Sequence, residues 1–129
     1  MLGKFVLWVS GLIFLAYGLV CLVDPAIPAG YAGFQLSGGD AFVEVAAMYG
    51  GLQAGFGAWC LLGAINSYYS RASLLSIVFV IGALAVGRVI GLSQGLGDVS
   101  SYTYGAIFYE STTALLALLS LRVKNSSTD

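Results

Sequence analysis

Three ionisable residues, Glu44, Arg88 and Glu110, lie inside long apolar stretches of the 129-residue chain. Ionisable groups within membrane helices are typical of ion paths, proton relays and binding sites for charged ligands. The alternative interpretation is a structural ion pair, which sets the helices that pack together without any ligand. Because Arg88 and Glu110 would neutralise each other, the structural interpretation is somewhat favoured in so small a protein.

Polar residues of the stretch 42–65 could extend this pair. Glu44 lies about 3 Å from the start of that stretch at the rise of a helix, so we expect it either to reach water or to join Arg88 and Glu110. Gln53 is the deepest polar group of the stretch, and Tyr49 supplies a hydroxyl in the same half. We therefore predict a buried ion pair or ligand site made of five residues: Arg88, Glu110, Glu44, Gln53 and Tyr49.

Several kinds of chemistry are excluded by residue type. The chain contains no histidine, so it has no imidazole base, no His metal ligand and no Ser-His-Asp triad. Its two cysteines, Cys21 and Cys60, are expected near opposite membrane surfaces, too far apart for a disulfide. We predict no catalytic residue, no metal and no cofactor, and a non-enzymatic role is favoured.

The elements that position these residues follow from composition. Hydrophobic residues make up 59% of the chain, charged residues only 9%, and the mean hydropathy is +0.93, whereas soluble domains carry about 25% charged residues. Runs of about 20 apolar residues can cross a bilayer as helices. We predict an all-α, four-transmembrane-helix bundle that forms a single integral membrane domain over residues 1–129, with helices at 5–23, 42–65, 73–96 and 102–121.

Arg88 and Glu110 have matching positions in two consecutive predicted spans. Arg88 is eight residues before position 96, and Glu110 is eight residues after position 102. Both side chains are therefore expected about 12 Å below the same surface. A lone arginine at a helix centre costs about 2.5–3.5 kcal/mol on insertion scales, so Arg88 is expected to face Glu110 rather than lipid.

The distribution of basic residues predicts the orientation. Lys4, Arg71, Arg122 and Lys124 all fall at one side of the predicted bundle, and Asp24, Asp40 and Asp98 fall at the other. Lys and Arg concentrate in cytoplasmic loops. Both termini are therefore expected on the cytoplasmic side (N-in/C-in), with the Arg88 site opening outward.

The predicted external loop at 24–41 has two equally weighted interpretations. Tyr31 and Phe34 would suit a short segment at the level of the lipid head groups, where aromatic rings are favoured. The alternative is an irregular connector that covers the helix ends, since the stretch is rich in glycine, a poor helix former.

Glycines recur at a spacing of four residues in the second and third predicted spans. This spacing places small residues on one helix face and permits close packing of backbones. The predicted packing positions are Gly51, Gly55, Gly87, Gly91 and Gly95. Whether they pack within one chain or between copies stays open at this point.

Two segments carry a resemblance to a known family. The run 42–57, which includes Tyr-Gly-Gly-Leu-Gln, and the segment Gly-Arg-Val-Ile-Gly at 87–91 are followed by Glu110. Together they resemble a family of small four-helix bacterial membrane proteins that is classed as a domain of unknown function. The chain is more distantly similar to DoxX-like membrane proteins. The resemblance implies a four-helix fold in the bacterial inner membrane and brings no activity.

Three functions are compatible with these features. The favoured one is an accessory or structural membrane subunit that associates with itself, as a homo-oligomer, or with other subunits of a larger complex. The second is binding or transport of a small or lipophilic ligand at an outward-facing Arg/Glu site. The third is a redox accessory subunit, by analogy with DoxX-like proteins. The lipid bilayer is an expected partner, and the lack of a basic run argues against nucleic acid.

Overall fold

The computed structural model describes residues 1–95 and 97–125, and this part of the chain contains helices and no strands. Four helical stretches, 2–23, 39–65, 67–93 and 101–123, are long and apolar enough to cross a membrane. The predicted all-α fold with four long apolar helices is confirmed. The elements are α1 (Leu2–Val23), α2 (Ala26–Ala32), α3 (Gly39–Val45), the π-helix η1 (Ala46–Gly51), α4 (Leu52–Ile65), α5 (Ser67–Ser93) and α6 (Ser101–Asn125).

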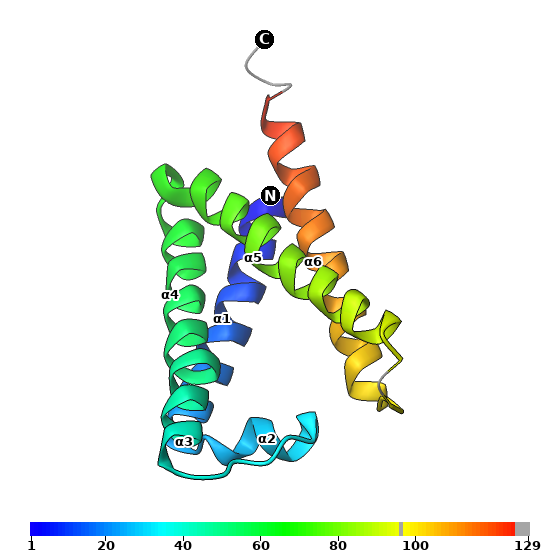
Figure 1. Ribbon diagram of the computed structural model, residues 1–129. Helices are drawn as coiled ribbons and strands as arrows, with labels where there is room; N and C mark the ends of the chain where they lie inside the picture. The colour runs from blue at the N-terminus through cyan, green and yellow to red at the C-terminus, as the bar shows by residue number, and fades with distance from the viewer. Residues whose placement is uncertain (96, 126–129) are drawn as a thin grey trace.

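The four long helical stretches form two pairs (Figure 1). α1 packs mainly on α4, and α5 packs mainly on α6. The pairs meet where the first half of α5 crosses α1 and α4, and they diverge toward α2 (Figure 1). The start of α1 and the end of α6 lie at the same end of the molecule.

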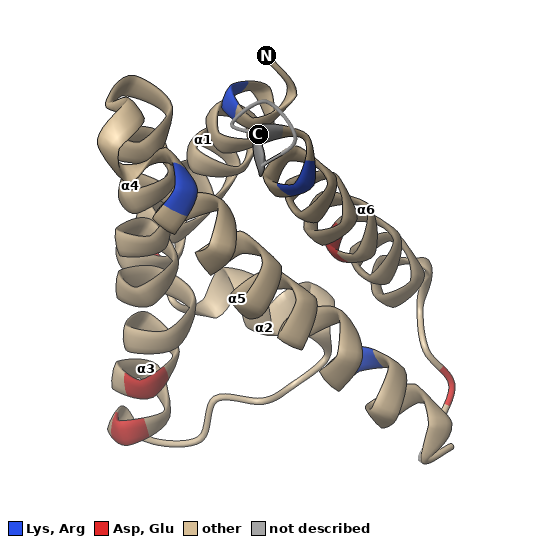
Figure 2. Cartoon of the chain, turned by 90° about the horizontal axis from the view of Figure 1, so that it is seen from above, with Lys and Arg blue, Asp and Glu red and all other residues tan. Residues whose placement is uncertain are grey.

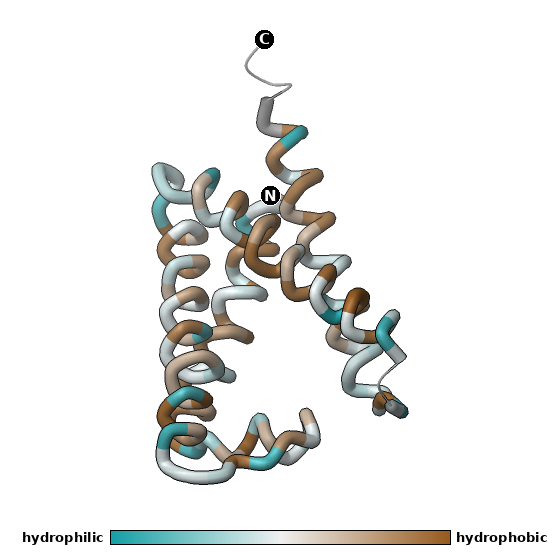
Figure 3. Tube along the Cα trace, viewed as in Figure 1, coloured by the Kyte–Doolittle hydropathy of each residue, from teal (hydrophilic) through white to brown (hydrophobic). Residues whose placement is uncertain are grey.

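The core lies where the two pairs meet. Leu7 of α1, Cys60 of α4 and Ile77 of α5 are fully buried there, together with Ala117 of α6. Hydrophobic residues are also found around the outside of the helices (Figure 3), and Phe79 and Phe108 are both 74% exposed. Helices that are apolar on all sides are typical of membrane spans, because their outer faces contact lipid.

The α1–α4 pair packs backbone against backbone. A Cβ atom at Gly18 would overlap the backbone of Ala54, and one at Gly57 would overlap the backbone of Leu15. Small residues allow such close approach, which increases van der Waals contact between helices in lipid.

α3, η1 and α4 run on as one continuous helical stretch, Gly39–Ile65. The wider π-turn at Ala46–Gly51 interrupts its regular α-helical geometry. Such turns are rare and are seldom longer than one turn. No sequence pattern predicted this turn, and it changes the direction in which the side chains near it point.

The reversal between α4 and α5 takes a single residue, Asn66. Its side chain accepts a hydrogen bond from the backbone N–H of Tyr68 at 3.0 Å, which caps α5. Ser70 Oγ donates to the carbonyl of Gly63 at 2.5 Å, and Trp59 Nε1 donates to Ser76 Oγ at 3.1 Å. Because of this cap, the span predicted to start at 73 starts at Ser67 instead.

The end of α5 also differs from the prediction. The helix ends at Ser93, and Gly95 has a left-handed φ of 63° that terminates it. The predicted end at position 96 lies outside the residues that the structure describes.

The segment 24–41 combines both expected forms. Asp24 Oδ1 accepts from the backbone N–H of Ala26 at 3.0 Å and helps to start α2. α2 ends at Gly33, whose φ of 75° is left-handed. Pro28 is buried in the first turn of α2, where its missing N–H breaks no hydrogen bond. The glycine-containing residues that follow, 34–38, are irregular.

Candidate functional site

The α5–α6 pair is joined by an ion pair. Arg88 Nε donates to both carboxylate oxygens of Glu110, at 2.9 and 3.0 Å. The side chain of Glu110 is only 6% exposed, and that of Arg88 is 30% exposed. The buried carboxylate therefore has a counter-charge on the neighbouring helix, as burial of a charge in an apolar environment requires.

The two partners lie at unequal distances from their helix ends. Arg88 is five residues from the end of α5, about 8 Å along the axis, and Glu110 is nine residues from the start of α6, about 14 Å. The predicted equal distance of eight residues from each helix end is wrong, because α5 ends earlier and α6 begins earlier than expected. The long arginine side chain spans the difference.

Arg88 also faces a cavity. Both hydrogen bonds of Arg88 to Glu110 use Nε, and its guanidinium carbon lies 5.7 Å from the ring centre of Tyr102. The cavity has a volume of about 350 Å³ and is lined by Arg88, Gly91, Leu92, Gly97, Asp98, Val99 and Thr103. The two terminal nitrogens of a guanidinium are donors that suit a carboxylate, phosphate or carbonyl group.

The cavity contains both signs of charge and apolar walls. Asp98 comes from the α5–α6 connection and is exposed. Thr103, from the first turn of α6, adds a hydroxyl, while Leu92 and Val99 are apolar. This lining can accept a molecule whose polar part offers an acceptor to Arg88 and a donor to Asp98.

A row of tyrosines connects this site to α2 and α1. The ring centres of Tyr102 and Tyr31 lie 5.1 Å apart, and Tyr31 Oη donates to Tyr17 Oη at 2.6 Å. Burial raises the pKa of the Tyr31 hydroxyl above its ordinary value. The tyrosine row, Tyr17–Tyr31–Tyr102, therefore bridges the two helix pairs through α2 at the end where they diverge.

The chain belongs to the DUF4345 family. The family is described as a domain of unknown function, and its model matches residues 2–121. Comparisons with curated proteins and with solved structures gave no match. The match to the DUF4345 model therefore covers nearly the whole chain, but the family description assigns no activity.

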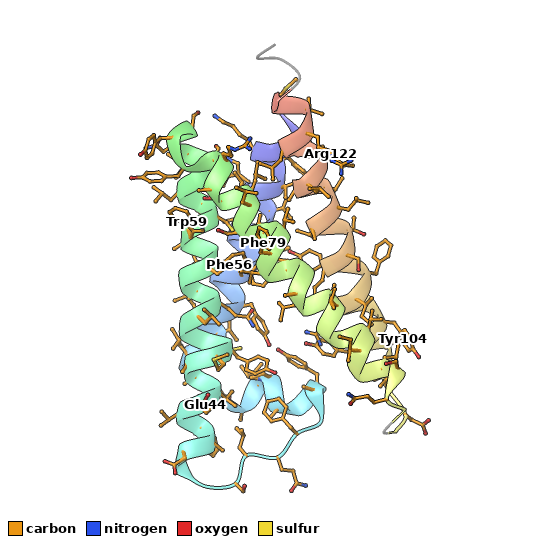
Figure 4. The ribbon with its side chains drawn as sticks, turned by 45° about the horizontal axis from the view of Figure 1, so that its top comes forward. Glu44, Phe56, Trp59, Phe79, Tyr104 and Arg122 are labelled. Carbon is orange, nitrogen blue, oxygen red and sulfur yellow. The ribbon has the colours of Figure 1, made fainter. Side chains whose placement is uncertain are left out.

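Three predicted site residues lie away from the ion pair. Glu44 of α3 is exposed (Figure 4), and the acidic residues of α3 lie far from the basic residue in the second half of α5 (Figure 2). Tyr49 of η1 stacks near Phe34, with ring centres 5.9 Å apart, and Gln53 of α4 is half-buried. The predicted extension of the pair to Glu44 is not formed, because α3, η1 and α4 belong to the other helix pair.

The predicted packing glycines do not form close contacts within the chain. A Cβ atom at Gly55, Gly87 or Gly91 would meet nothing within 4 Å, and one at Gly51 would meet only a backbone oxygen at 3.9 Å. Gly95 belongs to the turn after α5. Close backbone contacts occur instead at other glycines, because α1 rather than α5 is the main neighbour of α4. The four-residue spacing therefore did not identify the packed face.

Sequence reasoning missed three residues of this site. Thr103 could have been found, because it precedes Glu110 by seven residues and so lies on the same face of α6. Asp98 and Tyr102 carried no such signal. Their positions depend on how the α5–α6 connection turns and on where α2 packs.

Proposed function

We propose that this protein is a multi-pass membrane protein that binds a small amphipathic ligand in the cavity beside Arg88. The observation that supports this most is the position of Arg88. Its Nε donates to Glu110, and Arg88 also lines a cavity of about 350 Å³. A purely structural pair has no need of a cavity. This geometry therefore favours ligand binding over the purely structural role that the sequence favoured.

The lining supports a particular class of ligand. Arg88 can donate to a carboxylate or phosphate group, and Asp98 can accept from a hydroxyl or ammonium group on the same molecule. Leu92 and Val99 suit a short apolar part. The proposed ligand is thus a small molecule with a polar head that carries both an acceptor and a donor, and with an apolar body.

The location proposed for this activity is the bacterial inner membrane, with both ends of the chain on the cytoplasmic side. Lys4 lies at the start of α1, Arg71 at the start of α5 and Arg122 near the end of α6, whereas the Arg88 cavity lies near the end of α5. The basic residues of these three helix ends lie together at one end of the molecule (Figure 2). By the positive-inside rule that end faces the cytoplasm. The Arg88 cavity then opens to the outer side.

Native mass spectrometry of the full chain purified in mild detergent tests the binding proposal. Asp98→Asn and Thr103→Val change the cavity without changing the ion pair, and Arg122→Gln is a control at the other end of the molecule. We expect a copurifying small molecule on the wild-type protein and the control. Its amount should be reduced by up to about tenfold in the cavity variants, as loss of a polar contact to a bound ligand predicts. Equal retention of the molecule by all variants would overturn the proposal.

Association with another membrane helix is a second candidate, supported by one observation. Gly55 and Gly87 are exposed, and among the residues that the structure describes no atom of another helix lies within 4 Å of a Cβ built at either position. Such positions permit close approach of a helix from a second copy or another subunit. We expect Gly87→Leu to dissociate an oligomer in lipid nanodiscs, whereas Gly105→Leu, at an equally open position on α6, leaves it intact. A wild-type protein that is monomeric in nanodiscs and copurifies alone contradicts this candidate.

A further inference from the structure

A second cavity lies at the other end of the molecule, where α1 and α5 begin and α6 ends. It has a volume of about 320 Å³ and is lined by Met1, Leu2, Gly3, Lys4, Ser70, Leu74, Ser120 and Val123. Along α5, Ser70 is 21 residues before Gly91 of the Arg88 cavity, which corresponds to about 30 Å. The two cavities therefore lie near opposite surfaces of a membrane.

The polar groups of this basic-end cavity are one cation and two hydroxyl oxygens. Lys4 is exposed, and no contact of its ammonium group is described. Ser70 Oγ donates to Gly63 O at 2.5 Å, and Ser120 Oγ donates to Leu116 O at 2.8 Å. Because their protons are already used, the two serine oxygens can only accept further hydrogen bonds.

The surroundings of the basic-end cavity are positive. Arg71 directly follows Ser70 and Arg122 directly precedes Val123, so three helices contribute a basic residue at this end (Figure 2). Figure 4 shows Arg122 on α6 at that end and Glu44 toward the other. The acidic residues that the structure describes lie in the middle of α6 or toward the end of the molecule away from Lys4 (Figure 2). Clusters of this kind attract the anionic lipids of a membrane surface.

The basic-end cavity also has apolar walls. Leu2, Leu74 and Val123 stand beside the polar groups, and Leu2 and Val123 are exposed on the outside of helices that contact lipid. A fully water-soluble anion would leave these side chains without a partner. A phospholipid places its phosphate, its head group and the start of its acyl chains side by side at this depth.

We propose that the basic-end cavity binds an anionic phospholipid with hydroxyls in its head group. In this arrangement Lys4 pairs with the phosphate, and the oxygens of Ser70 and Ser120 accept hydrogen bonds from the head-group hydroxyls. Leu2, Leu74 and Val123 contact the glycerol and the first acyl carbons. This site is independent of the one proposed beside Arg88.

The test uses the full chain in mild detergent with an equimolar mixture of phosphatidylglycerol and phosphatidylcholine. Native mass spectrometry measures how much of each lipid is bound to the protein. Lys4→Gln removes the cation, and Lys4→Arg retains it. Gln94→Glu lowers the net charge by the same amount as Lys4→Gln, at the far end of α5. Thermal unfolding of each variant without lipid checks that the fold is retained.

We expect one phosphatidylglycerol bound preferentially to the wild-type protein, to Lys4→Arg and to Gln94→Glu. The preference over phosphatidylcholine should fall about fivefold in Lys4→Gln, which corresponds to the loss of one basic residue near a membrane surface. Ser120→Ala should weaken the binding of phosphatidylglycerol. It should leave the binding of phosphatidic acid unchanged, because that lipid has no head-group hydroxyl.

Three results would overturn the proposal. The first is an equal affinity of the wild-type protein for phosphatidylglycerol and phosphatidylcholine. The second is a preference for phosphatidylglycerol that Lys4→Gln does not change. The third is displacement of the lipid by an excess of inorganic phosphate, which would assign the cavity to free phosphate instead.

Discussion

The α1–α4 and α5–α6 pairs are held together by different kinds of contact. In α1–α4, Gly18 and Gly57 bring two backbones into direct contact. In α5–α6, the charged side chains of Arg88 and Glu110 bridge the helices. Backbone contact leaves no room between helices, whereas a side-chain bridge leaves room for the Arg88 cavity beside it.

The difference suggests a division of roles. The α1–α4 pair forms a closely packed support that also carries α2. In the α5–α6 pair, the ion pair between Arg88 and Glu110 joins the helices, and the guanidinium of Arg88 also lines a cavity. Changes in the first pair should therefore affect the fold, and changes in the second should affect both stability and binding.

The largest effect is expected from filling the α1–α4 contact. Gly57→Leu places a side chain where the backbone of Leu15 already lies, so we expect a loss of at least about 3 kcal/mol in the free energy of unfolding. Gly55→Leu, two residues earlier at an open position on the same helix, is the control and should cost less than about 1 kcal/mol. Titration with SDS in mixed micelles measures both, and similar losses for the two variants would show that backbone contact does not hold this pair.

Breaking the ion pair should come next. Glu110→Gln leaves Arg88 without its counter-charge and is expected to cost about 3 kcal/mol, the range for removing one partner of a buried pair. The exchange Arg88→Glu with Glu110→Arg should recover most of this loss in the same SDS titration. If the double exchange is no more stable than either single change, direct pairing does not stabilise the α5–α6 contact.

The tyrosine row tests whether α2 connects the two pairs. Tyr31→Phe removes the hydrogen bond to Tyr17 and retains the ring contact with Tyr102. We expect a loss of about 1 kcal/mol and faster hydrogen exchange in α2. Tyr104→Phe, at an exposed tyrosine on α6, serves as the control and should change neither measurement.

The smallest effect is expected at Glu44. This side chain is exposed on α3 and lies apart from Arg88, so Glu44→Gln should change the free energy of unfolding by less than about 0.5 kcal/mol. It should also leave the molecule that copurifies with the wild-type protein unchanged. A loss comparable to that of Glu110→Gln would mean that the two helix pairs share one charged cluster.

Prediction from the sequence succeeded for features that depend on single stretches of chain. The four long helices follow from runs of about 20 apolar residues, and an inward partner for Arg88 follows from the cost of an unpaired charge in lipid. The helix ends were less accurate. The cap at Asn66 and the left-handed Gly95 moved both ends of α5 by several residues.

Prediction failed where two helices had to be paired correctly. The spacing of Gly87 and Gly91 is the same as that of a packing motif, yet both lie in open space within the chain. Gly18 and Gly57, which do pack closely, have no such motif with each other because they belong to different helices. A spacing rule describes one helix face and carries no information about which neighbour covers it.

Composition and hydropathy by themselves determined that this protein has four membrane-length helices and one charged pair to bury, because these are properties of each stretch in an apolar solvent. Only the tertiary structure decided that Glu44 lies outside the site, that Asp98 and Tyr102 lie within it, and that cavities form at both ends. The physical reason is that helices in lipid are paired by the fit of their surfaces rather than by hydrophobicity. Since that fit depends on crossing angles, the π-turn and the ends of neighbouring helices, it arises only when the whole bundle assembles.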